Sequence, residues 1–203
     1  MTSQWGSAAR RYAAAEYRSY GTLPRWVLRR PDVPPGQVPF RYVGAVLPVL
    51  WTFIAVSLVE LVAMHVIIPW PVVRLVLDVV GVWGLLWMLG LTASLTVKPH
   101  LVGETGLRVR NGVTTDLFLP WAAVAAVAVR RRSREGSRAV QLDRSEDGVV
   151  LDVVVGSQTT VDVVLREPLV LELPGGAERV TAVRLAADDA AGLVARARAF
   201  LPA

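Results

Sequence analysis

The chain has 203 residues, of which 53% are hydrophobic and only 19% are charged. This apolar content excludes disorder over the whole length, because disordered chains lack the apolar residues needed to bury surface. The charged fraction is also too low for an ordinary soluble protein of this size. The absence of cysteine excludes disulfide bonds, iron–sulfur clusters and thiolate metal sites. The composition therefore favours an integral membrane protein with a modest soluble part.

The net charge of +5 lies in the first 41 residues, where seven arginines outnumber Glu16 and Asp32. Residues 42–97 hold one arginine against two carboxylates, and residues 98–203 hold fourteen bases against thirteen acids. A nucleic-acid-binding domain needs its basic excess on a folded surface, so no nucleic-acid partner is expected. Four prolines between positions 31 and 39 interrupt any helix. Residues 1–41 are therefore predicted to form a flexible basic juxtamembrane arm.

Arginine and aromatic residues are interleaved in this arm. Arg25, Arg29 and Arg30 lie around Trp26, shortly before the first long apolar run. Basic residues at a cytoplasmic membrane face attract anionic lipid headgroups, each by about 1 kcal/mol. We predict such lipid contacts for these three arginines. The alternative is that they only fix the orientation of the membrane segments.

Two long apolar runs follow, residues 42–68 and 75–97, and a Pro-Trp-Pro turn separates them. As helices they would be about 35–40 Å long, enough to cross a hydrocarbon core of about 30 Å. Residues 42–97 are therefore predicted to form a transmembrane helical hairpin, with two buried helices of a soluble core as the alternative. Basic residues lie before the first run and after the second. The positive-inside rule then predicts a multi-pass plasma-membrane protein with both termini in the cytoplasm.

Four ionisable residues lie inside or beside these runs: Glu60, His65, Arg74 and Asp78. Unpaired charges are unfavourable in lipid, so these side chains are expected to pair across the hairpin or in an oligomer. Arg74 and Asp78 are four residues apart on one helix and can pair directly. We interpret the four as a structural clamp, because two helices alone cannot enclose a pathway. An ion or proton relay in an oligomer is the alternative.

From residue 98 onward, short stretches that alternate between apolar and polar residues replace the long apolar runs. Turn dipeptides such as Asn111-Gly112 separate them. A helix is predicted over residues 188–201, with an aspartate at its N-cap. Residues 98–203 are therefore predicted to form a mainly antiparallel β sandwich or partly open barrel with a terminal helix. The predicted strands are residues 107–110, 116–119, 124–129, 139–143, 149–155, 159–166, 169–173 and 178–185.

One segment carries a family resemblance. Leu119-Pro120-Trp121, followed by a valine-rich strand over residues 124–127 and a basic cluster, resembles bacterial pleckstrin-homology-like membrane proteins. Residues 165–168, 173–174, 183–185 and 187–189 are similar to an uncharacterised actinobacterial branch of that group, and the alanine-, valine- and arginine-rich composition fits a high-GC genome. The resemblance covers residues 42–203 and implies a pleckstrin-homology-like (PH-like) fold without a catalytic signature. That fold has seven strands and a helix, whereas eight or nine strand-like stretches occur here, so an OB-like barrel is the alternative.

The sequence contains no nucleophile elbow, phosphate-binding loop, dinucleotide-binding motif or HExxH zinc motif. Its two histidines have different settings, so we expect neither a metal site, a cofactor nor enzymatic activity. Arg130, Arg131 and Arg132 are candidates for contacts with anionic headgroups, with a solvated strand end as the alternative.

We therefore predict a membrane-anchored, non-catalytic binding or scaffolding module at the cytoplasmic face of the membrane. Its expected partners are membrane lipids and either a second copy of the chain or another membrane protein. An oligomeric transport or ion-relay component that uses the intramembrane charges is the alternative function.

Overall fold

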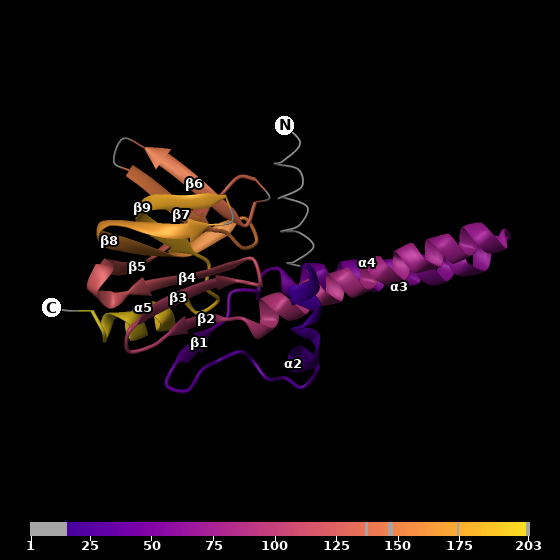
Figure 1. Cartoon of the computed structure of the whole chain (residues 1–203), viewed down its shortest axis with the longest axis horizontal. Coiled ribbons are helices and arrows are strands. Elements are labelled where there is room, and N and C mark those ends of the chain that lie inside the picture. Colours follow the sequence, from indigo (N-terminus) through magenta and orange to yellow (C-terminus); the bar gives the residue numbers. More distant parts are fainter. Residues whose placement is uncertain (1–15, 137, 146–147, 174, 202–203) are drawn as a thin grey trace.

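The computed structural model describes residues 16–136, 138–145, 148–173 and 175–201. A hairpin of two long helices, α3 (Leu47–Ile67) and α4 (Pro71–Val97), projects from a β domain (Figure 1). α3 begins later than residue 42, and α4 begins earlier than residue 75. Pro71 can open α4 because the missing N–H of a proline in the first turn breaks no helical hydrogen bond.

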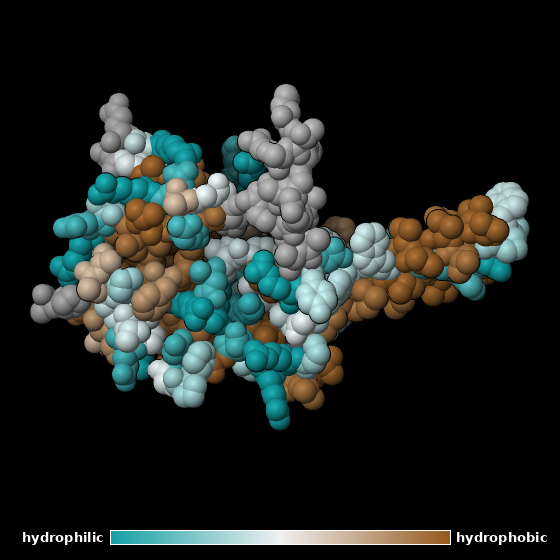
Figure 2. All heavy atoms as spheres, in the orientation of Figure 1, coloured by the Kyte–Doolittle hydropathy of each residue, from teal (hydrophilic) through white to brown (hydrophobic). Residues whose placement is uncertain are grey.

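Both helices of the hairpin are long and apolar enough to cross a membrane. In the most apolar 18-residue window of each helix, 6% of the α3 window and none of the α4 window is buried. Figure 2 shows apolar side chains along the visible face of the hairpin where it extends beyond the β domain. The hairpin is therefore not a buried core of the β domain, as the soluble alternative required.

The strands form one sheet of four strands and one sheet of five strands. The first sheet, in the order β1-β2-β3-β4, contains β1 (Val38–Phe40), β2 (His100–Val102), β3 (Gly106–Asn111) and β4 (Thr115–Pro120). The second, in the order β5-β8-β9-β7-β6, contains β5 (Val124–Ser133), β6 (Val140–Ser145), β7 (Gly148–Val153), β8 (Gln158–Leu173) and β9 (Gly176–Leu185). Neighbouring strands are antiparallel, except that β7 and β9 run parallel.

The strand boundaries differ from the prediction in β8, which joins the two predicted strands 159–166 and 169–173. Its pairing with β9 shifts register between Val164 and Leu169. Pro168 lies in this irregular stretch, where its missing N–H removes no bond from a regular ladder. β1 and β2 were not predicted, because a three-residue strand is too short to show an alternating pattern.

The arm also differs from its prediction. Within the proposed flexible segment 1–41, residues 38–40 form β1 and pair with β2, Val38 opposite Val102 and Phe40 opposite His100. Further upstream, the carboxylate of Glu16 accepts a hydrogen bond of 3.0 Å from the indole N–H of Trp83 on α4. The arm before Glu16 lies outside the described residues. Its described part is thus attached to both the sheet and the hairpin.

The core of the β domain lies between the two sheets and the terminal helix α5 (Ala190–Arg198). Alternate residues of β8 and β9, such as Val161, Val163 and Val183, are fully buried, as expected for strands with one face toward a core. Leu193 of α5 joins the same cluster, and Asp189 caps the helix by accepting a hydrogen bond from the N–H of Gly192 at 2.8 Å. The predicted pair of apolar helices, antiparallel sheets and terminal helix are confirmed.

A buried joint connects the hairpin to the β domain. His100 accepts a hydrogen bond at Nδ1 from the backbone N–H of Arg110 at 3.0 Å, so its Nε2 donates to the carbonyl of Ala186 at 2.8 Å. The ring of Tyr42 lies 4.5 Å from that of His100, centroid to centroid, and its hydroxyl accepts from the N–H of Gly112 at 2.8 Å. Burial lowers the pKa of His100 to about 4 and raises the pKa of Tyr42, so both side chains are neutral at physiological pH.

A second contact fixes the entry into α3. The carboxylate of Asp188 accepts from the N–H of Gly44 at 3.0 Å, and the N–H of Asp188 donates to the carbonyl of Arg41 at 2.8 Å. Because these bonds join the segment before α3 to the segment before α5, they set the position of the hairpin base relative to the β domain. The residues around Arg41 therefore hold a defined place beside the end of α4.

Candidate functional site

A short helix, α2 (Leu23–Val27), lies against the base of the hairpin. The Trp26 ring stacks on that of Trp51 in α3, with 6.0 Å between the centroids and 28° between the planes. After α2 the chain turns sharply, because Arg29 has a φ of +52°. The N–H of Arg30 then reaches the carbonyl of Arg25 at 2.8 Å, and that of Arg29 reaches the carbonyl of Trp26 at 3.0 Å.

This pair of bonds is a Schellman motif, in which glycine usually occupies the left-handed position. An arginine at that position is strained, by about 1 kcal/mol or more. Strained backbone of this kind clusters at ligand-binding sites, where the surrounding structure holds it in place. The strained turn therefore makes the arginines beside it candidates for a ligand-binding site.

These arginines line a pocket of about 590 Å³ between α2, β1 and the end of α4, which we call the basic pocket. Four guanidinium groups and several apolar side chains contribute to it, and its described lining contains no carboxylate. Its lining consists of Arg25, Trp26, Val27, Arg29, Arg30, Pro31, Pro39, Arg41, Thr96, Val97 and Pro99. Such a lining can hold an anion through charge-assisted, bidentate hydrogen bonds while apolar groups cover its uncharged part.

Asp32 holds the pocket in place. Its backbone N–H donates to the carbonyl of Val97 at the end of α4 at 2.8 Å, and its own carbonyl accepts from Nη1 of Arg110 at 2.9 Å. Its carboxylate also pairs with Nη1 of Arg25 at 2.9 Å. Asp32 therefore neutralises part of the Arg25 charge, whereas Arg29, Arg30 and Arg41 have exposed side chains and no ion pair with a described residue.

Three of these four arginines, Arg25, Arg29 and Arg30, were predicted from the sequence as lipid contacts. The structure brings them together and adds Arg41, which the sequence analysis passed over. A signal for Arg41 was present, since it is the last charged residue before the first apolar run and must lie near the membrane end of the arm. Sequence reasoning could not show that β1 carries it to the same pocket.

The arginines in the second half of β5 have a different environment. Arg130 and Arg131 are exposed and form no ion pair with a described residue. Arg132 instead pairs through Nη2 with Oδ2 of Asp162 at 3.1 Å, and Arg134 pairs through Nη2 with Oδ2 of Asp152 at 2.7 Å. The predicted headgroup contact of Arg132 therefore competes with a carboxylate already in place.

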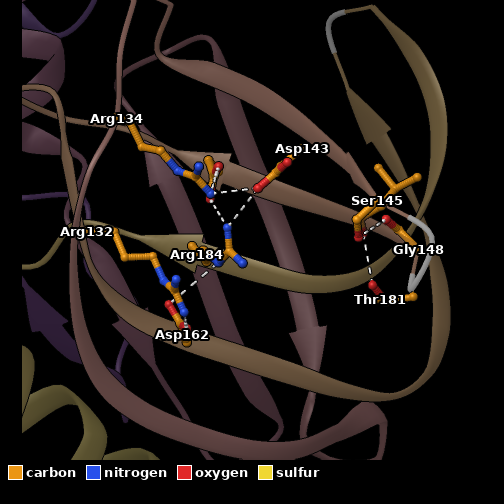
Figure 3. Close-up of polar contacts among 10 residues, drawn as sticks. Arg132, Arg134, Asp143, Ser145, Gly148, Asp162, Thr181 and Arg184 are labelled. Atoms are coloured by element: carbon orange, nitrogen blue, oxygen red, sulfur yellow. Dashed lines mark hydrogen bonds and ion pairs between the residues drawn. The ribbon is translucent and has the colours of Figure 1, made fainter.

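Arg132 and Arg134 belong to a charge network on the second sheet, formed by Arg132, Arg134, Asp143, Asp152, Asp162 and Arg184. Arg184 on β9 lies opposite Asp152 on β7 and Asp162 on β8 in the strand register. Figure 3 shows its guanidinium directed at both Asp143 and Asp162, at 3.3 Å and 3.8 Å. These residues alternate with buried valines and leucines, so the network covers the face of the sheet that points away from the core.

The charges of the network interact with one another within the β domain rather than with an outside ligand. Hydrogen bonds from Arg134 and Arg184 lower the pKa of Asp143, whereas burial raises the pKa of Asp152, whose side chain is only 2% exposed. Three arginines oppose three aspartates, so the network has no net charge and attracts an anionic headgroup weakly. In the basic pocket, Arg25 is the one arginine of four that pairs with a carboxylate of the described residues, so the pocket is the better candidate site.

The four ionisable residues of the hairpin are not all brought together. Nδ1 of His65 on α3 lies 2.8 Å from Oδ2 of Asp78 on α4, so these two side chains connect the helices near their turn. Asp78 thus pairs across the hairpin rather than with Arg74, its predicted neighbour on the same helix. Arg74 and Glu60 form no ion pair with a described residue.

Within the described ranges, no group of three or more histidine, aspartate or glutamate side chains is placed to hold a metal ion. No family model matches the chain, and neither a curated protein nor a solved structure shows significant similarity to it. The candidate site is therefore assigned from the geometry of this chain alone.

Proposed function

We propose that the chain is a membrane-anchored, non-catalytic binding module whose basic pocket holds an anionic lipid headgroup at the cytoplasmic face of the membrane. In this proposal α3 and α4 cross the membrane and both termini lie in the cytoplasm. The observation that carries the proposal is the convergence of four arginines and Trp26 at the base of a lipid-compatible hairpin. Arginine is well suited to this role, because its planar fork binds phosphate through two parallel hydrogen bonds.

The neighbourhood of the pocket supports a lipid rather than a soluble anion. Val27 and Leu28, next to the arginines, are 73% and 64% exposed. Exposed apolar side chains beside arginines are typical of segments that lie in the headgroup region with their apolar side toward the acyl chains. Trp26 and Trp51 stack at the same level, and tryptophan is enriched at membrane interfaces.

The pair of His65 and Asp78 supports a clamp in the hairpin rather than a relay. Because Nδ1 of the histidine pairs with one carboxylate oxygen across α3 and α4, the two side chains fix the rotation and register of the helices. We also propose that the β domain is PH-like rather than OB-like. Two packed sheets followed by a C-terminal helix support this assignment.

Lipid retention by the intact protein tests the headgroup proposal. We expect Arg29→Gln/Arg30→Gln to lose about 2 kcal/mol of binding to anionic lipid, about thirtyfold, because each arginine near the surface contributes about 1 kcal/mol. Arg138→Gln/Arg179→Gln removes the same charge from exposed positions of the β domain and is the matched control. Native mass spectrometry of the protein in mixed neutral and anionic lipid gives the retained lipids. Equal retention by both variants would contradict the proposal.

The topology is tested separately, by reporter fusions at the C-terminus. A reporter that is active only in the cytoplasm should give signal, and one that is active only outside should not. Signal from the outer reporter, or recovery of the full chain in the soluble fraction without detergent, would overturn the membrane arrangement.

A further inference from the structure

A groove of about 710 Å³ runs along the hairpin between α3 and α4, away from the basic pocket. Its wall contains small residues of both helices together with one ionisable group, Glu60. Ser57, Glu60 and Ala63 contribute from α3, and Gly81, Gly84 and Trp87 contribute from α4. The inference drawn from this groove rests on the proposed membrane crossing of the two helices.

The two glycines of the groove have different roles. A Cβ on Gly81 would lie 2.7 Å from Cδ1 of Leu61, so α4 packs closely on α3 at this glycine and a larger residue would displace the end of the Leu61 side chain. A Cβ on Gly84 would meet no atom within 4 Å. The packing of the hairpin therefore does not explain a glycine at position 84. The space beside it is open to a side chain from another helix, and small residues allow helices in lipid to approach closely.

Glu60 supplies the second observation. Its side chain is exposed on α3, has no ion pair with a described residue, and lies about 15 Å from the hairpin turn by helical rise. A carboxyl group that faces acyl chains at this depth is unfavourable, and such groups in membrane proteins face a partner. The ionisable groups nearer the turn, His65 and Asp78, pair with each other, with 2.8 Å between Nδ1 and Oδ2.

We propose that this groove is the contact surface for a second copy of the chain, with the two Glu60 carboxyl groups hydrogen-bonded to each other across a two-fold axis along the membrane normal. Such an axis brings equivalent residues together at equal depth. A protonated carboxyl group both donates and accepts a hydrogen bond, so it is complementary to its own copy. The open space beside Gly84 receives the neighbouring helix.

Crosslinking of single cysteines in the membrane tests this contact, and the natural absence of cysteine makes the chain a clean background. Ser57 lies one turn before Glu60 in the groove. Val62 lies on the opposite side of α3 by helical angle and is 57% exposed. Oxidation of membranes that contain the full chain should crosslink Ser57→Cys into a dimer about tenfold more than Val62→Cys, because a disulfide forms only between close Cβ atoms.

Substitutions at Glu60 then test the carboxyl pair in the Ser57→Cys background. Glu60→Gln should keep the crosslink, because an amide group also donates and accepts, whereas Glu60→Leu should lose most of it. Gly84→Leu should lose it as well, since the side chain fills the open space, and Val79→Leu on the opposite side of α4 is its control. Thermal unfolding of each variant in detergent distinguishes a folded monomer from a misfolded chain.

Equal crosslinking at positions 57 and 62, no crosslink at position 57, or a crosslink of position 57 only to a different protein would overturn the proposed dimer. These outcomes leave the lipid proposal intact, because the basic pocket lies at the other end of the hairpin. Conversely, a chain that is soluble without detergent would refute the membrane arrangement itself, and the fractionation step that precedes oxidation reveals it.

Discussion

The basic pocket and the charge network are both rich in arginine, yet they differ in what faces the guanidinium groups. Four arginines line the pocket and no described lining residue is a carboxylate, whereas three arginines of the network meet three aspartates. The pocket keeps a positive potential that an external anion can satisfy. In the network, the charges of the arginines are balanced by aspartates of the same protein. The number of arginines in a segment therefore says less about anion binding than the carboxylates on the strands beside it.

The largest expected effect comes from removing one carboxylate of the network. Asp152→Ala leaves Arg134 and Arg184 short of a buried partner, and breaking a buried pair destabilises by about 3 kcal/mol or more. Thermal or urea unfolding of the detergent-solubilised full chain measures this loss. Retention of anionic lipid by the folded fraction should be unchanged. A parallel loss of lipid retention would show that the two regions are not independent.

The buried joint between the hairpin and the β domain gives the next largest effect, through His100. Its pKa is about 4 in the folded protein and 6.5 in a model peptide, so above pH 6.5 the histidine is neutral in both states. As the pH falls below 6.5, the unfolded chain binds a proton that the folded chain excludes. Stability then falls by about 1.4 kcal/mol per pH unit until the pH approaches 4.

Between pH 6.5 and pH 5 this amounts to about 2 kcal/mol in the native chain. His100→Gln should be less stable at neutral pH, because the joint loses packing, but should show a flatter dependence over this range. Unfolding at several pH values checks both, and His65, present in both proteins, cancels in the comparison. An identical slope for the two proteins would refute the role of His100.

A smaller effect, with opposite signs in two measurements, is expected for Arg29→Gly. Glycine relieves the left-handed strain at φ +52°, so the free energy of unfolding should rise by about 1 kcal/mol. Loss of one guanidinium should weaken retention of anionic lipid about fivefold. Arg30→Gly, after the turn, should weaken retention without the gain in stability. A gain in stability with unchanged lipid retention would show that Arg29 does not contribute to lipid binding.

The smallest effect is expected at an exposed pair outside both regions. Arg108 and Asp116 pair at the surface of the first sheet, with side chains 41% and 38% exposed. Asp116 also lies 3.7 Å from Nε of the buried Arg110, so the variant that removes only the exposed pair is Arg108→Ala. Arg108→Ala should change the free energy of unfolding by less than about 1 kcal/mol. Measured beside Asp152→Ala, it shows how much of the larger effect is due to burial.

Several parts of the fold could be predicted because their signals are local. The apolar runs, the strand-like alternation and the cap at the start of α5 each depend on a few consecutive residues. Arg132 shows the limit of this reasoning. Its basic neighbours favour a headgroup contact, but Asp162, thirty residues later, lies beside it once β5 pairs with β8. A cluster of like charges cannot reveal a partner that only strand pairing supplies.

The sequence by itself determined three things: the two long apolar helices, the place of the basic excess, and the short strands followed by a terminal helix. It could do so because length, hydropathy and turn chemistry are properties of contiguous segments. Only the tertiary structure decided that β1 joins the sheet and that Arg41 lines the same pocket as Arg25 at the end of α4. It also decided that Asp78 pairs with His65, and that Glu60 has no ion-pair partner among the described residues. These outcomes depend on which distant segments meet and in what register, and contacts between segments far apart along the chain leave no periodic signal in it.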